Sequence, residues 1–213
     1  MKTDDLVAML AAGAAPVEPG TTSRRYAAAL GWGAFGATLL MAIVLGVRPD
    51  LADAVRLPMF WMKLAFPACL AAGALIAATR LSRPGVQLGR ASAALAAPVL
   101  AMWLLAAFVL ATAAADQREA LILGDTWNEC PSLVAMLSLP VFVAALWAMQ
   151  GLAPTRLALS GAAAGLLAGS VGALVYALHC PEMEAPFLAI WYLLGMLIPT
   201  AAGALIGPRL LRW

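Results

Sequence analysis

Charged residues are scarce in this chain, and this scarcity excludes the commonest class of protein. Only 11% of the 213 residues are charged, against about 25% in a soluble globular domain. Hydrophobic residues make up 64%, and the mean hydropathy is +0.91. No long stretch has the charged composition of a separate soluble domain. The sequence therefore predicts an integral membrane protein.

Residues that carry chemistry are also few. A single histidine excludes a histidine-based metal cage inside the protein. The sequence shows no glycine-rich phosphate loop, no paired carboxylates and no Ser/His/Asp constellation. No Cys-x-x-Cys motif of a disulfide-exchange enzyme is present either. We therefore expect a protein that is not an enzyme and binds no cofactor.

Six stretches are long and apolar enough to cross a membrane as helices, which takes about 20 residues. Their interiors are rich in Ala, Leu and Gly and lack the alternation of barrel strands. The sequence predicts an all-α membrane protein with a six-helix transmembrane domain over residues 26–213. The expected spans are Tyr26–Val47, Phe60–Thr79, Ala91–Ala113, Ser132–Met149, Leu157–Leu178 and Pro186–Ile206.

With six spans both termini lie on one side, and the basic residues indicate which side. Nine of the thirteen lysines and arginines fall in segments on the side of the termini, and four fall on the other side. The positive-inside rule then places both termini in the cytoplasm of a bacterial inner membrane. Lys63 lies just inside the second span, where its long stem can reach the interface.

The span interiors hold no Asp, Glu or Arg, the groups with which ion-coupled transporters carry charge. This argues against transport. A small transporter or channel remains an alternative function only if a polar pathway crosses the bundle. The fifth span carries Gly161, Gly165 and Gly169 at four-residue spacing, which lets another helix backbone approach closely. We favour packing inside the bundle, and a homo-oligomer stays open.

Two of the three cysteines are each followed by proline and lie at an outer mouth of the bundle. Cys130 directly precedes the fourth span, and Cys180 follows the fifth. A short turn joins these two spans, so their outer ends should meet and bring both thiols to one depth. Cys69 lies within the second span, where we interpret it as a small apolar packing group.

Three interpretations of Cys130 and Cys180 stay open. A static disulfide would clamp two outer loops together, as in a purely structural membrane subunit. A switchable pair would sense oxidants, and the exposed loop positions favour this interpretation. A thiophilic metal could bind the two thiolates together with an imidazole and carboxylates, which are supplied by His179, Glu129, Glu182 and Glu184.

Residues 1–25 form the only cytoplasmic segment of useful size. They predict a short amphipathic helix that ends near Pro16–Gly20 and that is too short to be stable alone in water. Its acidic first turn fits a protein with a basic groove better than a membrane surface. The candidate partner-binding residues are a capping threonine, two acids and three apolar side chains: Thr3, Asp4, Asp5, Leu6, Met9 and Leu10.

This layout resembles the NrsF family, membrane anti-sigma factors that hold extracytoplasmic-function (ECF) sigma factors inactive at the inner membrane. The matching features are the start Met1–Leu6 with Leu10, then Pro16-Val17, Arg24-Arg25, and the motifs Cys130-Pro131 and Cys180-Pro181. The resemblance implies that the N-terminal tail binds an ECF sigma factor at the cytoplasmic face. It also implies that the cysteine pair relays oxidative or heavy-metal stress from the periplasm to release that factor. The expected partners are the sigma factor and membrane lipid, without direct contact to nucleic acid.

Overall fold

The computed structural model describes residues 2–12 and 20–212, and all regular structure in these two ranges is helical. Six helices in this part of the chain are long and apolar enough to span a membrane, which confirms the predicted number. The observed ends lie within five residues of the predicted ones. These helices are α2 (Thr21–Val44), α4 (Pro58–Leu81), α5 (Ala91–Thr112), α7 (Cys130–Gln150), α8 (Leu157–Tyr176) and a sixth over Ala185–Leu210.

The sixth spanning helix is continuous but not uniform. It begins as α9 (Ala185–Phe187), widens into a π-helical turn, η1 (Leu188–Tyr192), and continues as α10 (Leu193–Leu210). Such widened turns are rare and occur frequently at functional sites. Three shorter helices, too short for hydropathy to reveal as spans, lie outside the six: α1 (Thr3–Ala12), α3 (Leu51–Ala54) and α6 (Arg118–Leu123).

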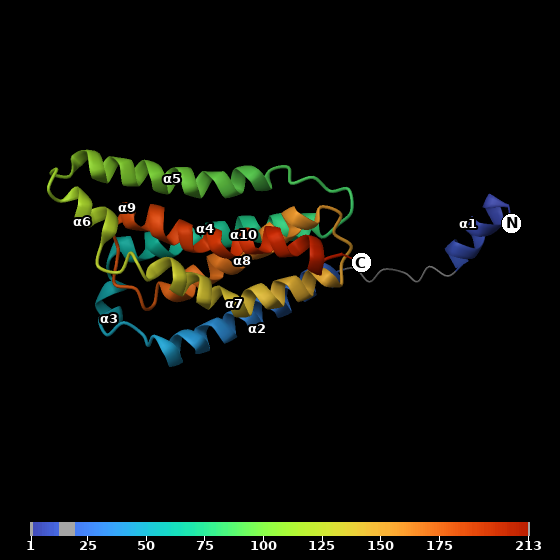
Figure 1. Ribbon diagram of the computed structural model, residues 1–213, viewed down its shortest axis with the longest axis horizontal. Coiled ribbons are helices and arrows are strands. Elements are labelled where there is room, and N and C mark those ends of the chain that lie inside the picture. The colour runs from blue at the N-terminus through green and yellow to red at the C-terminus, as the bar shows by residue number, and fades with distance from the viewer. Residues whose placement is uncertain (1, 13–19, 213) are drawn as a thin grey trace.

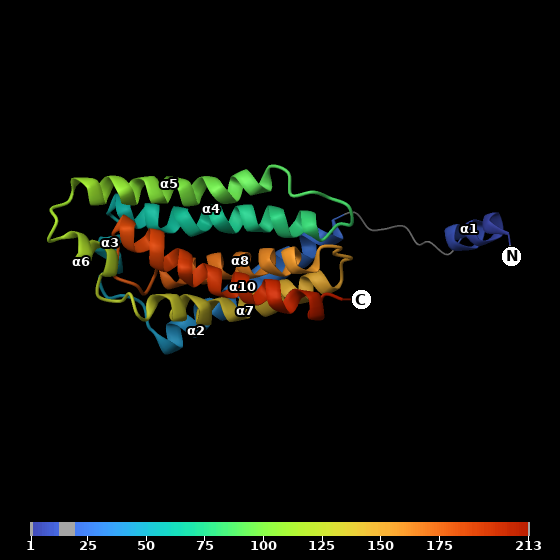
Figure 2. The same ribbon diagram turned by 45° about the horizontal axis from the view of Figure 1, so that its top comes forward.

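The helix α8 lies at the centre of the bundle. Two thirds of its spanning segment (67%) is buried, against 11% for α5. It packs against α10, α7 and α4, whereas α5 packs on α4 and on the start of the sixth span. Figures 1 and 2 show α5 along one edge and α2, packed on α7, along the other. Both ends of the chain lie toward the same end of the bundle.

Glycines allow α8 and α10 to pack backbone against backbone. A Cβ atom on Gly161 would collide with the carbonyl oxygen of Gly203, and one on Gly165 would collide with that of Pro199. A Cβ on Gly169 would lie 2.8 Å from a carbonyl oxygen of α10. The predicted glycine face is therefore confirmed as a packing surface inside the bundle.

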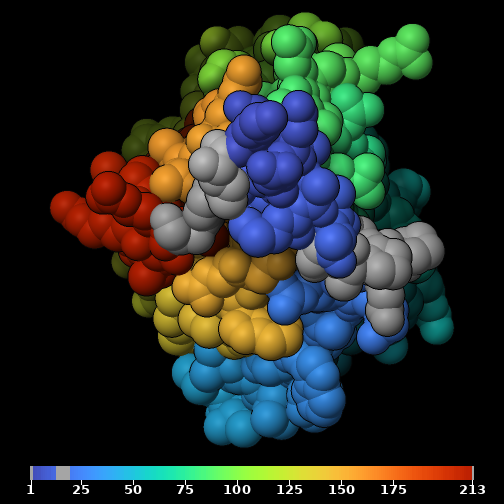
Figure 3. All heavy atoms as spheres, turned by 90° about the vertical axis from the view of Figure 1, so that its right-hand side faces the viewer, coloured from blue at the N-terminus to red at the C-terminus, as the bar shows by residue number. Residues whose placement is uncertain are grey.

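The end of the bundle that carries the termini is held together by a buried polar contact. The hydroxyl groups of Tyr26 and Ser82 lie 2.9 Å apart and join the start of α2 to the end of α4. Figure 3 looks onto this end, with α1 projecting in front of the bundle. No residue of α1 is buried. The helix α1 therefore exposes all its side chains.

Candidate functional site

The two Cys-Pro motifs meet at the end of the bundle opposite the termini. Cys130 is the first residue of α7, and Cys180 follows the turn that ends α8. The helices α7 and α8 pack against each other, as predicted. Tyr176, at the end of α8, is buried at the same end of the bundle. Both cysteines are free in this structure.

Neither thiol is exposed, and the prediction of exposed loop positions is therefore wrong. Cys130 and Cys180 both have a relative exposure of 0%. The buried ring of Tyr192, from the π-helical turn, packs on the ring of Tyr176 with centroids 5.8 Å apart. The backbone N–H of Cys180 donates to the Tyr176 carbonyl oxygen at 3.0 Å, which continues the last turn of α8 inward. The sequence shows where a loop begins but not that it folds onto the bundle.

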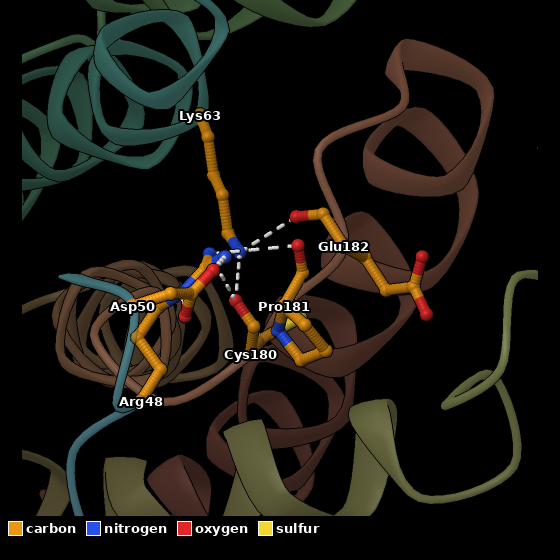
Figure 4. Close-up of polar contacts among 6 residues, drawn as sticks. All are labelled: Arg48, Asp50, Lys63, Cys180, Pro181 and Glu182. Carbon is orange, nitrogen blue, oxygen red and sulfur yellow. Dashed lines mark hydrogen bonds and ion pairs between the residues drawn. The ribbon is translucent and has the colours of Figure 1, made fainter. Parts of the chain in front are cut away.

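Lys63 of α4 binds this loop from within the bundle. Its side chain is fully buried, and its ammonium group donates to the carbonyl oxygens of Cys180 at 2.6 Å and Glu182 at 2.7 Å (Figure 4). The ammonium nitrogen also lies 5.5 Å from the centre of the Tyr192 ring. The prediction that Lys63 reaches out to the interface is wrong, because two backbone carbonyls take the place of water as its acceptors.

Arg48 reaches the same loop from the connection between α2 and α3. Its guanidinium group donates to the carbonyl oxygens of Cys180 at 3.1 Å and Pro181 at 3.4 Å, and both oxygens of the Asp50 carboxylate accept from it (Figure 4). The hydrogen bond to Asp50 raises the pKa of Arg48 above its usual value. The same bond holds the pKa of the Asp50 carboxyl below its usual value. Two cations therefore bind one three-residue segment, Cys180–Glu182.

The other residues considered for a metal site do not gather around the thiols. His179 directs Nδ1 to a carbonyl oxygen of the α2–α3 connection at 2.9 Å. Glu182 turns its carboxylate away, to accept from the backbone N–H of Asp125 at 2.8 Å. Glu129 and Glu184 are exposed. Within residues 2–12 and 20–212 no group of three or more His, Cys, Asp or Glu could hold a metal ion. The structure does not assemble the mixed thiolate, imidazole and carboxylate site.

Cys69 lies apart from this pair, on the surface of the bundle. It is exposed and borders an apolar groove between α4 and α5, beside Phe66 and Met102. The interpretation of Cys69 as a packing group in the core is wrong, because its face of α4 is turned outward. Its thiol has no part in the buried cluster.

The candidate partner-binding residues all lie on α1 and are all exposed. Thr3 is the first helical residue rather than the residue before the helix, so it does not occupy the predicted capping position. Asp4 and Asp5 stand in the first turn, and the backbone nitrogen of Lys2 donates to the Asp5 carboxylate at 3.3 Å. The acidic start of the helix is therefore as predicted.

Three apolar side chains of α1 have no cover from the rest of the described chain. Leu6 is 39% exposed, Met9 59% and Leu10 65%. Exposed apolar groups beside carboxylates on a ten-residue helix are typical of a segment that binds a protein partner. The predicted helix break at Pro16–Gly20 lies, except for Gly20, outside the described residues.

Four residues around the thiols were missed or misplaced by sequence reasoning: Arg48, Lys63, Tyr176 and Tyr192. The lysine carried a usable signal, because an ionisable residue inside a membrane span marks a functional site more often than not. The tyrosines carried no such signal, because tyrosines near the ends of spans are also typical of the aromatic belt at a membrane interface.

These features define a class of protein: a multi-pass helical membrane protein with buried free thiols at one end and both chain ends at the other. Comparison with known families is more specific. The profile of the NrsF family, described as "Negative regulator of sigma F", matches residues 10–213, and the chain therefore belongs to that family. This confirms the resemblance seen in the sequence.

Two curated relatives match over the full length of both chains. The probable anti-sigma-F factor NrsF of Azospira oryzae is 60% identical over 213 residues. The anti-sigma-F factor NrsF of Caulobacter vibrioides is 41% identical over 215 residues. Both names describe regulators rather than enzymes, in agreement with the expectation from the sequence. No solved structure matches this chain.

Proposed function

We propose that this chain is an inner-membrane anti-sigma factor that holds an ECF sigma factor through α1 and releases it when Cys130 and Cys180 are oxidised. Membership of the NrsF family and the names of two full-length relatives support the anti-sigma activity. The observation that carries the sensing role is the pair of free thiols buried in one cluster at the end of the bundle opposite α1.

The orientation follows from the charges of the chain. Nine basic residues lie in segments at the end that carries the termini, and the positive-inside rule assigns that end to the cytoplasm. The buried thiols then lie at the periplasmic end of the bundle, next to the compartment where disulfides form and persist. This arrangement puts the sigma-binding segment where a sigma factor is found and the sensor where oxidants arrive.

The helix α1 has the properties of a segment that orders on its partner. It is ten residues long, buries nothing and combines Asp4 and Asp5 with exposed apolar side chains. A partner that complements it presents an apolar groove with basic residues at the rim. Its acidic character makes direct contact with nucleic acid unfavourable, so the proposed target is the sigma factor itself.

The chemistry of the switch is oxidation of two thiols to one disulfide. Each cysteine loses one proton and one electron, and the oxidant takes up the two protons and two electrons in total. We take an oxidant as the signal, because the described residues gather no third ligand beside the two sulfurs that could complete a metal site of three or more ligands. A disulfide would pull the start of α7 toward the loop after α8, and this strain would be transmitted to the helices that pack on α8.

The sensing role is tested by replacing both cysteines. We expect the double variant Cys130→Ser, Cys180→Ser to keep a sigma-dependent reporter silent before and after hydrogen peroxide is added to cells. The matched control is Cys69→Ser, which removes the exposed thiol and should leave the response intact. A double variant that still activates the reporter would rule out the pair as the sensor.

The role of α1 is tested separately by deleting residues 2–12. We expect the truncated protein to insert into the membrane, because α1 buries no side chain, and to leave the reporter constitutively active. The control is the substitution Thr22→Ala beyond α1, which should keep the reporter silent. Continued repression by the truncated protein would rule out α1 as the sigma-binding segment.

A further inference from the structure

Lys63 lies inside a membrane-spanning helix and forms no direct ion pair with the described residues. Charged groups at such positions are costly and normally pair with an opposite charge. Within the described part of the chain no carboxylate lies within ion-pairing distance of this ammonium group. Its acceptors are the carbonyl oxygens of Cys180 and Glu182, at 2.6 and 2.7 Å. These neutral groups satisfy its hydrogen bonds without an ion pair, and the Asp50 carboxylate, which is bound to Arg48, acts on Lys63 only through space.

The two thiols lie within reach of that charge. The Lys63 ammonium binds the backbone of Cys180, and both cysteines lie within the range of its electrostatic field. Both sulfurs are removed from water, which makes an isolated thiolate there unfavourable. A nearby buried cation offsets this cost, and the thiolate is the form that forms disulfides. A thiolate on either cysteine would supply a nearby counter-charge for Lys63.

Lys63 also fixes the position of Cys180. The loop Cys180–Glu182 is not part of a helix, so its backbone needs other partners. The ammonium group binds it on both sides of Pro181, and Arg48 binds the Cys180 carbonyl from a second direction (Figure 4). Arg48 is neutralised by Asp50, whereas Lys63 is not. Both cations therefore hold the loop, and within the described residues Lys63 is the one that lacks a direct ion pair.

We propose that Lys63 is the positioning residue of the thiol pair, an inference that rests on the proposed redox role of the pair. By holding the carbonyl groups of Cys180 and Glu182, it keeps the Cys180 sulfur beside Cys130. Its charge stabilises the thiolate through which the disulfide forms. With an azo oxidant such as diamide, one thiolate adds to the N=N bond and the other displaces the resulting hydrazide. One S–S bond forms, and the N=N group gains two electrons and two protons.

The test measures disulfide formation in the purified full-length protein in detergent micelles. Cys69 is replaced by serine throughout, so that only the paired thiols react. Diamide is added, samples are quenched in acid, and the disulfide is quantified as the loss of two hydrogen atoms and of alkylatable thiol. The variants are Lys63→Met, Lys63→Gln and Lys63→Arg, with Arg56→Met as the matched control because Arg56 is an exposed cation near the same end of α4.

We expect Lys63→Met and Lys63→Gln to form the disulfide about tenfold more slowly or worse, because each loses a charge-assisted interaction. Lys63→Arg keeps the charge and should restore the rate to within about threefold, and Arg56→Met should match the unaltered chain. A purely structural role would make Lys63→Gln, which can still donate to a carbonyl oxygen, as fast as Lys63→Arg. If Lys63→Met does not fold, the rates of disulfide formation in Lys63→Gln and Lys63→Arg still show whether the charge matters.

Two results would overturn the proposal and have different meanings. If the unaltered chain forms the disulfide and both Lys63→Met and Lys63→Gln form it equally fast, the role of Lys63 is refuted and the redox switch stands. If the unaltered chain forms no disulfide under any diamide concentration, the switch itself fails, and the role of Lys63 falls with it.

Discussion

Replacing Gly165 with alanine adds one methyl group at the closest approach of α8 and α10. Its Cβ would lie 2.7 Å from the Cα of Thr200 and would collide with the carbonyl oxygen of Pro199. Ordinary contacts of a Cβ begin at 3.4 Å, so the two backbones would have to separate by at least 0.7 Å. Both groups in the way are backbone atoms, which cannot rotate aside.

The expected loss of stability follows from two opposing effects. Overpacking of a close-packed contact costs about 1–3 kcal/mol. Alanine has a higher helix propensity than glycine, which stabilises the fold by up to about 1 kcal/mol. We therefore expect Gly165→Ala to lower the free energy of unfolding by about 1–2 kcal/mol. The matched control is Gly31→Ala in α2, where a Cβ meets nothing within 4 Å and the change should be neutral or slightly stabilising.

Both variants would be unfolded from mild detergent by titration with sodium dodecyl sulfate while helicity is followed by circular dichroism. The reasoning predicts a clearly earlier transition for Gly165→Ala than for Gly31→Ala. Coincident transitions would mean that α8 and α10 do not pack backbone against backbone, and the description of the bundle's centre would be refuted.

Three further outcomes are expected. Tyr26→Phe removes the buried hydrogen bond to Ser82 and should lower the free energy of unfolding by about 1 kcal/mol in the same titration. The hydrogen bond to Arg48 lowers the pKa of Asp50 in the folded protein. The pair therefore stabilises the fold above the unfolded-state pKa of about 3.9, and this contribution disappears as the pH falls further. Because Asp50→Asn lacks the titrating carboxyl group, its unfolding midpoint should depend less on pH between about pH 5 and about pH 2 than that of the unaltered chain. Deletion of residues 2–12 should leave the unfolding transition unchanged, because α1 buries no side chain.

The helices of this protein could be predicted from its sequence because length and hydropathy are local properties. Each span needs about 20 apolar residues, and that requirement is visible without any tertiary contact. The glycines of α8 were predicted as a contact face for the same reason, since their spacing places them on one side of a helix. The short helix α3 and the π-helical turn η1 could not be predicted, because elements of four and five residues leave no periodic pattern in the sequence.

The candidate site could be predicted only in part. The pairing of Cys130 with Cys180 followed from the short turn between α7 and α8. Their burial did not, because it depends on a loop that is held by Lys63 and Arg48 from two other segments. The environment of Lys63 was misjudged for a related reason: an isolated helix would let this side chain extend to the interface, whereas the folded bundle offers it two carbonyl groups.

The central claim is that joining Cys130 and Cys180 releases the sigma factor from this protein. It is tested most directly by immobilising the purified complex in detergent, adding diamide in steps, and measuring bound sigma factor and disulfide in the same samples. We predict that bound sigma factor falls in proportion to the disulfide formed and returns when dithiothreitol reduces it. Full formation of the disulfide with the sigma factor still bound would contradict the claim.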